Sequence, residues 1–446
     1  MLLLCALDAH HIHASGHGRL SFVASSSSAR ELTPGYDWDG VHLIVGLQDF
    51  ACDLGLFAEP LSAGDVGFLE GVRVVDATRL LPGGFCTMLL SDMGAEVVKV
   101  EQPGLGDYMR ATPPIKDGRS PVHSTVNRNK LSIGIDLKDP RGKEVMRRLL
   151  KGADVFIEGF RPGAMSRLGF SFEEVCRINP RIVYCSISAY GQKSGLSSMP
   201  GHDINFQAMA GTLGYSPGPE VPLLQLSDMT SGMYAALAIV GALAGRRRAV
   251  RIDVPIVASL LSWMVLPASA YLATGRPPKE GHSLIFGSTP YYNLYETSDV
   301  KHIAVAAIEE EFWRNLVTVL GVPELEHRRF GTPKERREVT VALTRIFATK
   351  TRDEWARILM HRDTCATPVL TVEEALNSPW ARSLSMLVDL PDGETVLNGP
   401  VRSRPRARSG RFTRAPSLGE DTDVIMRTLG YTRKDVAELR AGRAVE

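Results

Sequence analysis

A histidine and an aspartate in this chain are of the right types to move a proton on and off one carbon atom. His202 stands in Gly201-His202-Asp203-Ile204-Asn205, and Asp228 stands where an extended segment gives way to a predicted helix. If the fold brings both side chains to one pocket, one can remove a proton and the other can return a proton on the opposite face. That is the minimum apparatus for racemising a carbon beside a carbonyl group.

Each of these residues also has a simpler, structural interpretation. His202 follows a Pro-Gly turn, where a lone histidine is more often a satisfied polar residue at the surface. Asp228 directly precedes the predicted helix, so we expect it to be the N-cap residue. Both interpretations of Asp228 can hold together, because a helix N-terminus offers free backbone donors. The amide of residue 228 is then predicted to lie beside the oxygen of an enolate.

Composition excludes several other classes of protein. The chain has 446 residues, 44% of them apolar and 23% charged, which is typical of a globular protein with two or three domains. A formal charge of +1 recruits neither nucleic acid nor a membrane surface, and no apolar run approaches the ~20 residues of a membrane span. The six cysteines show no paired spacing, so we expect a reducing, cytoplasmic environment and no zinc site.

The elements that must position the pair alternate between strand and helix. Strands are predicted at 72–76, 96–101, 132–137, 155–158 and 182–188, and helices at 83–93, at 140–151 and after Pro162. Strands that alternate with helices of this length indicate a parallel sheet covered on both faces. Further helices are predicted within 231–244, 255–272 and 433–441, and a smaller α+β unit is predicted from strands at 291–295 and 303–307 and a helix at 310–320.

These patterns divide the chain into five segments. Residues 1–66 form an extension without sustained periodicity. Its four histidines (His10, His11, His13 and His17) could bind a metal, but no acidic or cysteine partner completes a site. A large α/β domain covers 67–260, a linker 261–284, a small α+β domain 285–385 and a C-terminal segment 386–446. The arginine-rich run at 402–414 is typical of a solvated connector.

A nicotinamide enzyme is the first alternative to test, since Glu101 closes the second strand as a ribose-binding acid would. The loop after the first strand reads Leu80-Leu81-Pro82-Gly83-Gly84-Phe85, which is not a GxGxxG motif, and its proline lacks an amide donor. The chain also lacks a P-loop, an HExxH motif and a GxSxG motif. These absences argue against a dinucleotide oxidoreductase, a P-loop nucleotide-binding protein, an HExxH metalloprotease and a GxSxG hydrolase.

Many short blocks of the sequence resemble one enzyme family. They are 92–101, Arg128-Asn129-Lys130, Asp136-Leu137-Lys138, 158–163, 190–192, 201–205, 290–296, 307–309 and 363–370. In their order and spacing, residues from about 69 to the end resemble the class III CoA-transferase (CaiB/BaiF) superfamily, and most closely its α-methylacyl-CoA racemases.

The resemblance implies a Rossmann-like large domain, completed by the returning C-terminal segment, and a small domain in an interlocked homodimer. Each active site would lie between the large domain of one chain and the small domain of the other. His202 and Asp228 would be the acid/base pair, and Glu309 of the partner's small domain would orient His202. Coenzyme A is part of the substrate, so no separate cofactor is implied, and the residues expected to bind it are Arg128, Lys138, Arg161 and Arg167.

The resemblance leaves the reaction open among three alternatives. In the transferase branch the aspartate at position 228 is a nucleophile that forms an acyl anhydride, and in the racemase branch it is a base. His202 favours the racemase, because transferases of this superfamily usually carry a non-basic residue there. The short connection between His202 and Asp228, the segment Met229-Thr230-Ser231-Gly232 and the missing GxGQ turn at 245–251 depart from the racemase pattern. A CoA-binding protein without catalysis is the third alternative. We expect epimerisation of 2-methylacyl-CoA thioesters through an enolate.

Overall fold

The computed structural model describes residues 67–215, 220–245, 248–276, 289–401 and 412–446. The predicted N-terminal extension with its histidines, residues 277–284 of the predicted linker and most of the arginine-rich run lie outside the described residues.

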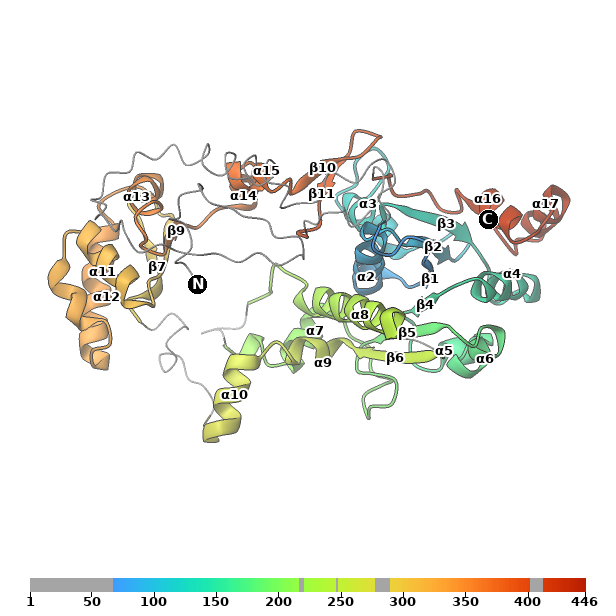
Figure 1. The fold of residues 1–446 in the computed structure, drawn as a ribbon, viewed down its shortest axis with the longest axis horizontal. Coiled ribbons are helices and arrows are strands. Elements are labelled where there is room, and N and C mark those ends of the chain that lie inside the picture. Colours follow the sequence, from blue (N-terminus) through green and yellow to red (C-terminus); the bar gives the residue numbers. More distant parts are fainter. Residues whose placement is uncertain (1–66, 216–219, 246–247, 277–288, 402–411) are drawn as a thin grey trace, which may run out of the picture. The chain divides into compact units, whose positions relative to one another are not determined.

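A six-stranded sheet, parallel throughout, forms the core of the large domain (Figure 1). Its strands are β1 (Arg73–Ala77), β2 (Glu96–Glu101), β3 (Lys130–Gly134), β4 (Val155–Glu158), β5 (Val183–Ser188) and β6 (Val250–Pro255), in the order β3-β2-β1-β4-β5-β6. This confirms the predicted α/β class. The order reverses between β1 and β4, and ligands of such sheets bind at that reversal, outside the carboxyl ends of the strands.

Alternate residues of each strand pack on opposite faces of the sheet. Val75, Val98 and Phe156 belong to one buried cluster, with α4 (Pro140–Lys151) and α6 (Phe172–Ile178). Val74, Val97 and Val155 belong to the other, with α2 (Leu80–Asp92) and α8 (Leu226–Gly245). Shorter helices complete the domain: α3 (Pro121–Asn127), α5 (Ala164–Leu168), α7 (Asp203–Met209), α9 (Ile256–Leu261) and α10 (Val265–Thr274).

Helix α8 has the length and hydropathy of a membrane span, contrary to the expectation that no apolar run approaches that length. Its buried residues Ala235, Ala236 and Ile239 nevertheless pack in the cluster that covers the sheet. Its first turn carries Asp228, which lines a pocket. These contacts are those of a core helix.

The C-terminal segment packs on the large-domain sheet. Helices α16 (Thr422–Thr428) and α17 (Arg433–Ala441) contribute Met426 and Val436 to the cluster on the α4 face. The Asp421 carboxylate accepts a hydrogen bond of 2.9 Å from the amide of Ser132. The strand predicted at 132–137 ends at Gly134, because the chain turns at Asp136 and residue 135 pairs with Val445 instead.

The small domain has a three-stranded antiparallel sheet in the order β7-β8-β9. Its elements are β7 (Tyr292–Glu296), β8 (His302–Ala306), α11 (Glu310–Val319), α12 (Pro333–Phe347), α13 (Arg352–Leu359) and β9 (Ala366–Pro368), around a core that includes Tyr295, Trp313 and Phe347. Helices α14 (Val372–Leu376) and α15 (Pro379–Ser383) and the hairpin of β10 (Leu387–Asp389) and β11 (Thr395–Leu397) follow.

Candidate active site

A pocket of about 340 Å³ lies at the reversal point of the large-domain sheet. Its walls come from the segments that follow β1, β4 and β5, from the start of α9 and from the segment that leads into α7. His202 and Asp228 both line it. The structure therefore brings the two predicted acid/base residues to one pocket, at the place where this kind of sheet binds ligands.

His202 is the residue that precedes α7. Its backbone is extended, with φ −125° and ψ 173°, and its amide donates to the Asn205 side chain at 3.0 Å. This bond fixes the backbone from which the imidazole projects. The histidine is exposed, so its ring is open to a molecule that enters the pocket.

Asp203 ties the start of α7 to the start of α8. Its Oδ1 accepts from the amides of Ser227 at 2.8 Å and Asp228 at 3.1 Å, and its Oδ2 accepts from Gln207 Nε2 at 2.6 Å. One carboxylate thus satisfies two first-turn amides of α8, which would otherwise lack a partner within the helix. In the sequence Asp203 is only a neighbour of His202, yet in the structure it holds the two functional residues in one arrangement.

Asp228 has an unusual electrostatic environment. Burial and, second, the negative charge of Asp203 raise its pKa from 3.8 to about 7. A carboxyl group with a pKa near the working pH can both accept and deliver a proton. Such a shift is typical of functional sites.

The structure corrects one expectation about Asp228. It is not an N-cap residue, because α8 already begins at Leu226. Its amide, predicted to lie beside an enolate oxygen, donates to Asp203 instead. To contact the oxygen of a substrate, the Asp228 amide would have to release the Asp203 carboxylate.

Apolar side chains form part of the remaining pocket wall. Ile187, Met199, Phe206 and Ile256 contribute to its walls, together with three prolines. Apolar walls around a few polar groups suit a hydrophobic ligand whose reactive end is positioned by those groups.

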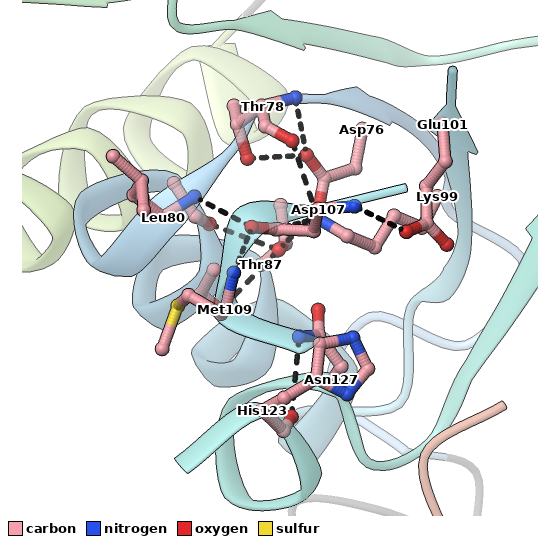
Figure 2. Close-up of polar contacts among 12 residues, drawn as sticks. Asp76, Thr78, Leu80, Thr87, Lys99, Glu101, Asp107, Met109, His123 and Asn127 are labelled. Carbon is pink, nitrogen blue, oxygen red and sulfur yellow. Dashed lines mark hydrogen bonds and ion pairs between the residues drawn. The ribbon is translucent and has the colours of Figure 1, made fainter. Parts of the chain in front are cut away.

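The turn between β1 and α2 forms one wall, and a buried charged cluster holds it in place (Figure 2). The Asp76 carboxylate accepts from the Thr78 amide at 2.9 Å and from its hydroxyl at 2.6 Å. Lys99 donates to the Thr78 carbonyl at 3.2 Å, and Asp107 accepts from the Leu80 amide at 3.0 Å. Leu80 has a φ of +65°, which side chains rarely adopt, so these bonds impose a strained turn on the pocket wall.

The charges of this cluster compensate one another. Lys99 lies 2.8 Å from Asp107 and 4.0 Å from Asp76, and all three side chains are buried. Although burial acts to raise it, the pKa of Asp107 is held below its ordinary range by the adjacent Lys99. Glu101, which a nicotinamide enzyme would offer to ribose, instead accepts from Arg110 at 2.6 and 2.8 Å. The structure therefore uses Glu101 internally.

The four basic residues predicted to bind CoA differ in position. Arg161 lines the pocket with His202 and Asp228, Arg167 is exposed in α5, and Lys138 lines a second pocket. Arg128 is 1% exposed and forms an ion pair with Asp92. These contacts assign Arg128 a structural role, and its predicted contact with CoA receives no support.

Glu309 belongs to the small domain, where it precedes α11. It is exposed, and its charge raises the pKa of the Cys365 thiol, second to burial. Glu309 is not among the described residues that line the pocket of His202. Its predicted role in a partner's site remains a prediction.

Comparison with known proteins identifies the family. Residues 69–422 match the family model of CoA-transferase family III. The chain belongs to this family. This confirms the resemblance seen in the sequence blocks, and it makes the chain an enzyme that acts on acyl-CoA thioesters.

Relatives of both reaction types are similar to the chain. Human α-methylacyl-CoA racemase is 32% identical over 398 residues, which cover 85% of this chain and 97% of that protein. Mouse succinyl-CoA:glutarate CoA-transferase is 30% identical over 396 residues, with 85% and 90% covered. A crystal structure of a CaiB/BaiF family protein from Brucella suis superposes with a TM-score of 0.71 at 29% identity, covering 81% of this chain and 99% of the other.

Proposed function

We propose that this enzyme epimerises the 2-methyl centre of 2-methylacyl-CoA thioesters. The observation that carries the proposal is the pairing of His202 and Asp228 in one pocket, with Asp228 poised to exchange a proton near neutral pH. A transferase needs the carboxylate at position 228 but has no evident use for the histidine. The similarity to mammalian α-methylacyl-CoA racemases supports the same choice.

The reaction is a transfer of protons at a single carbon. His202 removes the α-proton of one epimer, the negative charge passes to the thioester oxygen, and protonated Asp228 delivers a proton to the other face. For the other epimer Asp228 starts as the carboxylate and His202 as the imidazolium. The apolar walls around Met199 and Ile256 accommodate the acyl chain.

CoA transfer between carboxylic acids is the alternative, and its support is the similarity to several CoA-transferases. In that reaction the Asp228 carboxylate attacks the thioester carbonyl, CoA thiolate leaves, and an acyl anhydride remains on Asp228. CoA thiolate then attacks the Asp228 carbonyl of this anhydride, so that an aspartyl-CoA thioester forms and the first acid leaves as its carboxylate. The second acid attacks that thioester, CoA thiolate leaves, and a new anhydride forms. CoA attacks the acyl carbonyl of the new anhydride, which yields the second acyl-CoA and frees the Asp228 carboxylate.

One pair of assays distinguishes the two reactions. The enzyme is incubated in D2O with a single epimer of a 2-methylacyl-CoA, and separately with an acyl-CoA and a free carboxylic acid. Deuterium at Cα together with the second epimer supports the proposal. CoA exchange between acids without α-exchange, and a hydroxylamine-trappable anhydride on Asp228, would establish the transferase.

We further propose that the enzyme is a homodimer whose partner supplies Glu309. In support of a partner chain, α10 has no buried residue, and its Val265, Leu266 and Leu272 are exposed. Co-expression of His202→Ala with Glu309→Ala chains tests the arrangement, because a mixed dimer would regain one intact site only if Glu309 acts across the interface. Absence of complementation in dimers that form normally would contradict it.

A further inference from the structure

A second pocket of about 340 Å³ lies beside the active-site pocket, at the carboxyl ends of β1, β2 and β3. Arg79 and Phe160 line both pockets and so form their common boundary. The guanidinium of Arg79 lies 5.2 Å from the ring centre of Tyr108 and 5.5 Å from that of Phe160. A ligand that reaches from one pocket into the other must pass this arginine.

The last residues of the chain form part of this second pocket. Arg443 lines it, together with Lys138. The tail is fixed directly after Arg443: the Asp136 amide donates to the Ala444 carbonyl at 3.0 Å, and the Glu446 amide donates to the Gly134 carbonyl at 3.0 Å. A Cβ atom at residue 134 would lie 2.7 Å from Glu446, so glycine is needed where the tail crosses the sheet edge.

Arg443 adopts a backbone conformation that favours glycine. Its φ is +55°, in the left-handed region, although its side chain is exposed and packs in no core cluster. A strained residue that contributes nothing to packing points to a role in binding.

The charges of the second pocket are unbalanced. Within the described residues, neither Lys138 nor Arg443 has a carboxylate partner. Of the two acids of the pocket, Glu101 is paired with Arg110, whereas Asp136 accepts from the neutral amide of Lys138 at 2.8 Å and keeps its charge. One carboxylate therefore stands against several cations. With Arg79 at its boundary, the pocket offers three cationic side chains to an anion.

We propose that Arg443 is a further substrate-binding residue, which together with Lys138 holds a phosphate group at the nucleotide end of the CoA thioester. This inference rests on the proposed function, because it takes CoA as the carrier of the acyl group. The acyl end lies in the pocket of His202 and Asp228, and the phosphorylated end lies beyond Arg79. A guanidinium is suited to this task, because it binds phosphate with two parallel hydrogen bonds.

Calorimetric titration of free CoA into the full-length enzyme tests the proposal without any turnover. Arg443→Gly removes the charge and supplies the residue type that the backbone prefers, so the variant should melt no lower than the wild type. Its affinity for CoA should fall about tenfold or more, the effect of losing a charge-assisted bond. Arg433→Ala removes the same charge from the other end of α17, away from the pocket, and should leave the affinity within about twofold.

The choice of ligand identifies the phosphate. If the penalty of Arg443→Gly disappears with 3′-dephospho-CoA, Arg443 contacts the 3′-phosphate, and if it persists, Arg443 contacts the diphosphate. Either result supports the proposal. Unchanged CoA affinity in a folded Arg443→Gly enzyme with normal turnover would overturn the inference alone, whereas a wild type that binds no CoA would overturn it together with the proposed function.

Discussion

The substitution Asp203→Asn examines how the protein tunes its acid/base pair. Asp203 holds the first turn of α8 and raises the pKa of Asp228 through its charge. Asparagine keeps an oxygen for the amides of Ser227 and Asp228 but carries no charge. The substitution therefore separates the electrostatic effect of Asp203 from its role in positioning.

The size of the effect follows from the causes of the pKa shift. The pKa of Asp228 rises from 3.8 to about 7, with burial as the larger cause and Asp203 as the second. The charge of Asp203 thus accounts for less than half of the rise. Its removal should lower the pKa of Asp228 by about one pH unit, or roughly 1.4 kcal/mol of interaction free energy.

The rate of α-proton exchange as a function of pH reports this pKa. Where Asp228 is the base, the rate rises as pH increases through its pKa, and where Asp228 is the acid, the rate falls. In Asp203→Asn, the rise of the rate seen where Asp228 is the base and the fall seen where it is the acid should both move toward lower pH by about one unit. Asp154→Asn is a suitable control. The Asp154 carboxylate also accepts a hydrogen bond from a backbone amide, that of Arg73 at 3.0 Å, but Asp154 does not line the active-site pocket.

An unchanged profile in a folded Asp203→Asn enzyme would refute this account of Asp228. A loss of activity without a shifted profile would mean that Asp203 acts by positioning alone. Gln207 Nε2 donates to Asp203 Oδ2, and the amide nitrogen of asparagine at that position could not accept this hydrogen bond. The melting temperature of the variant therefore has to be measured as well, to detect any loss of stability from this contact.

Three further predictions concern chemistry and stability. His202→Ala should lower α-exchange by about a hundredfold or more, measured by mass spectrometry of the thioester in D2O, whereas CoA transfer, if present, would persist. Asp228→Asn should stabilise the fold above pH 7 by up to about 4 kcal/mol and have little effect near pH 4. The reason is that the wild-type fold loses stability as the pH rises from the ordinary pKa of the carboxyl group to its raised pKa in the folded state. Urea titrations at both pH values measure the free energy of unfolding and so test the sign. Lys99→Met should destabilise the fold by about 3–5 kcal/mol, because Asp107 loses its buried partner, whereas Lys434→Met, at an exposed pair with Glu438, should cost under about 1 kcal/mol.

Local sequence patterns predicted much of the fold. Helices α4 and α17 begin and end at the predicted residues, because a Pro or a Thr cap and a glycine mark their limits. Strand β6 was missed, since it pairs only with β5 and its arginine and aspartate interrupt the apolar pattern. The parallel arrangement of the large-domain sheet followed from the alternation of strands and helices.

The sequence could not reveal contacts between distant segments. The pairing of buried Arg128 with Asp92, 36 positions away, is one such contact, and no local pattern around Arg128 indicates it. The role of Asp203 depends on the approach of two helices. Arg443 reaches its pocket only because the chain end crosses the sheet beside Gly134.

The most direct test of the central claim follows the α-carbon itself. One epimer of a 2-methylacyl-CoA is incubated with the enzyme in D2O, and both the deuterium content at Cα and the proportion of the second epimer are measured over time. The account predicts that the second epimer appears with deuterium at Cα and that His202→Ala abolishes both signals. A substrate that keeps its α-proton while its CoA moves to an added carboxylic acid would contradict the account.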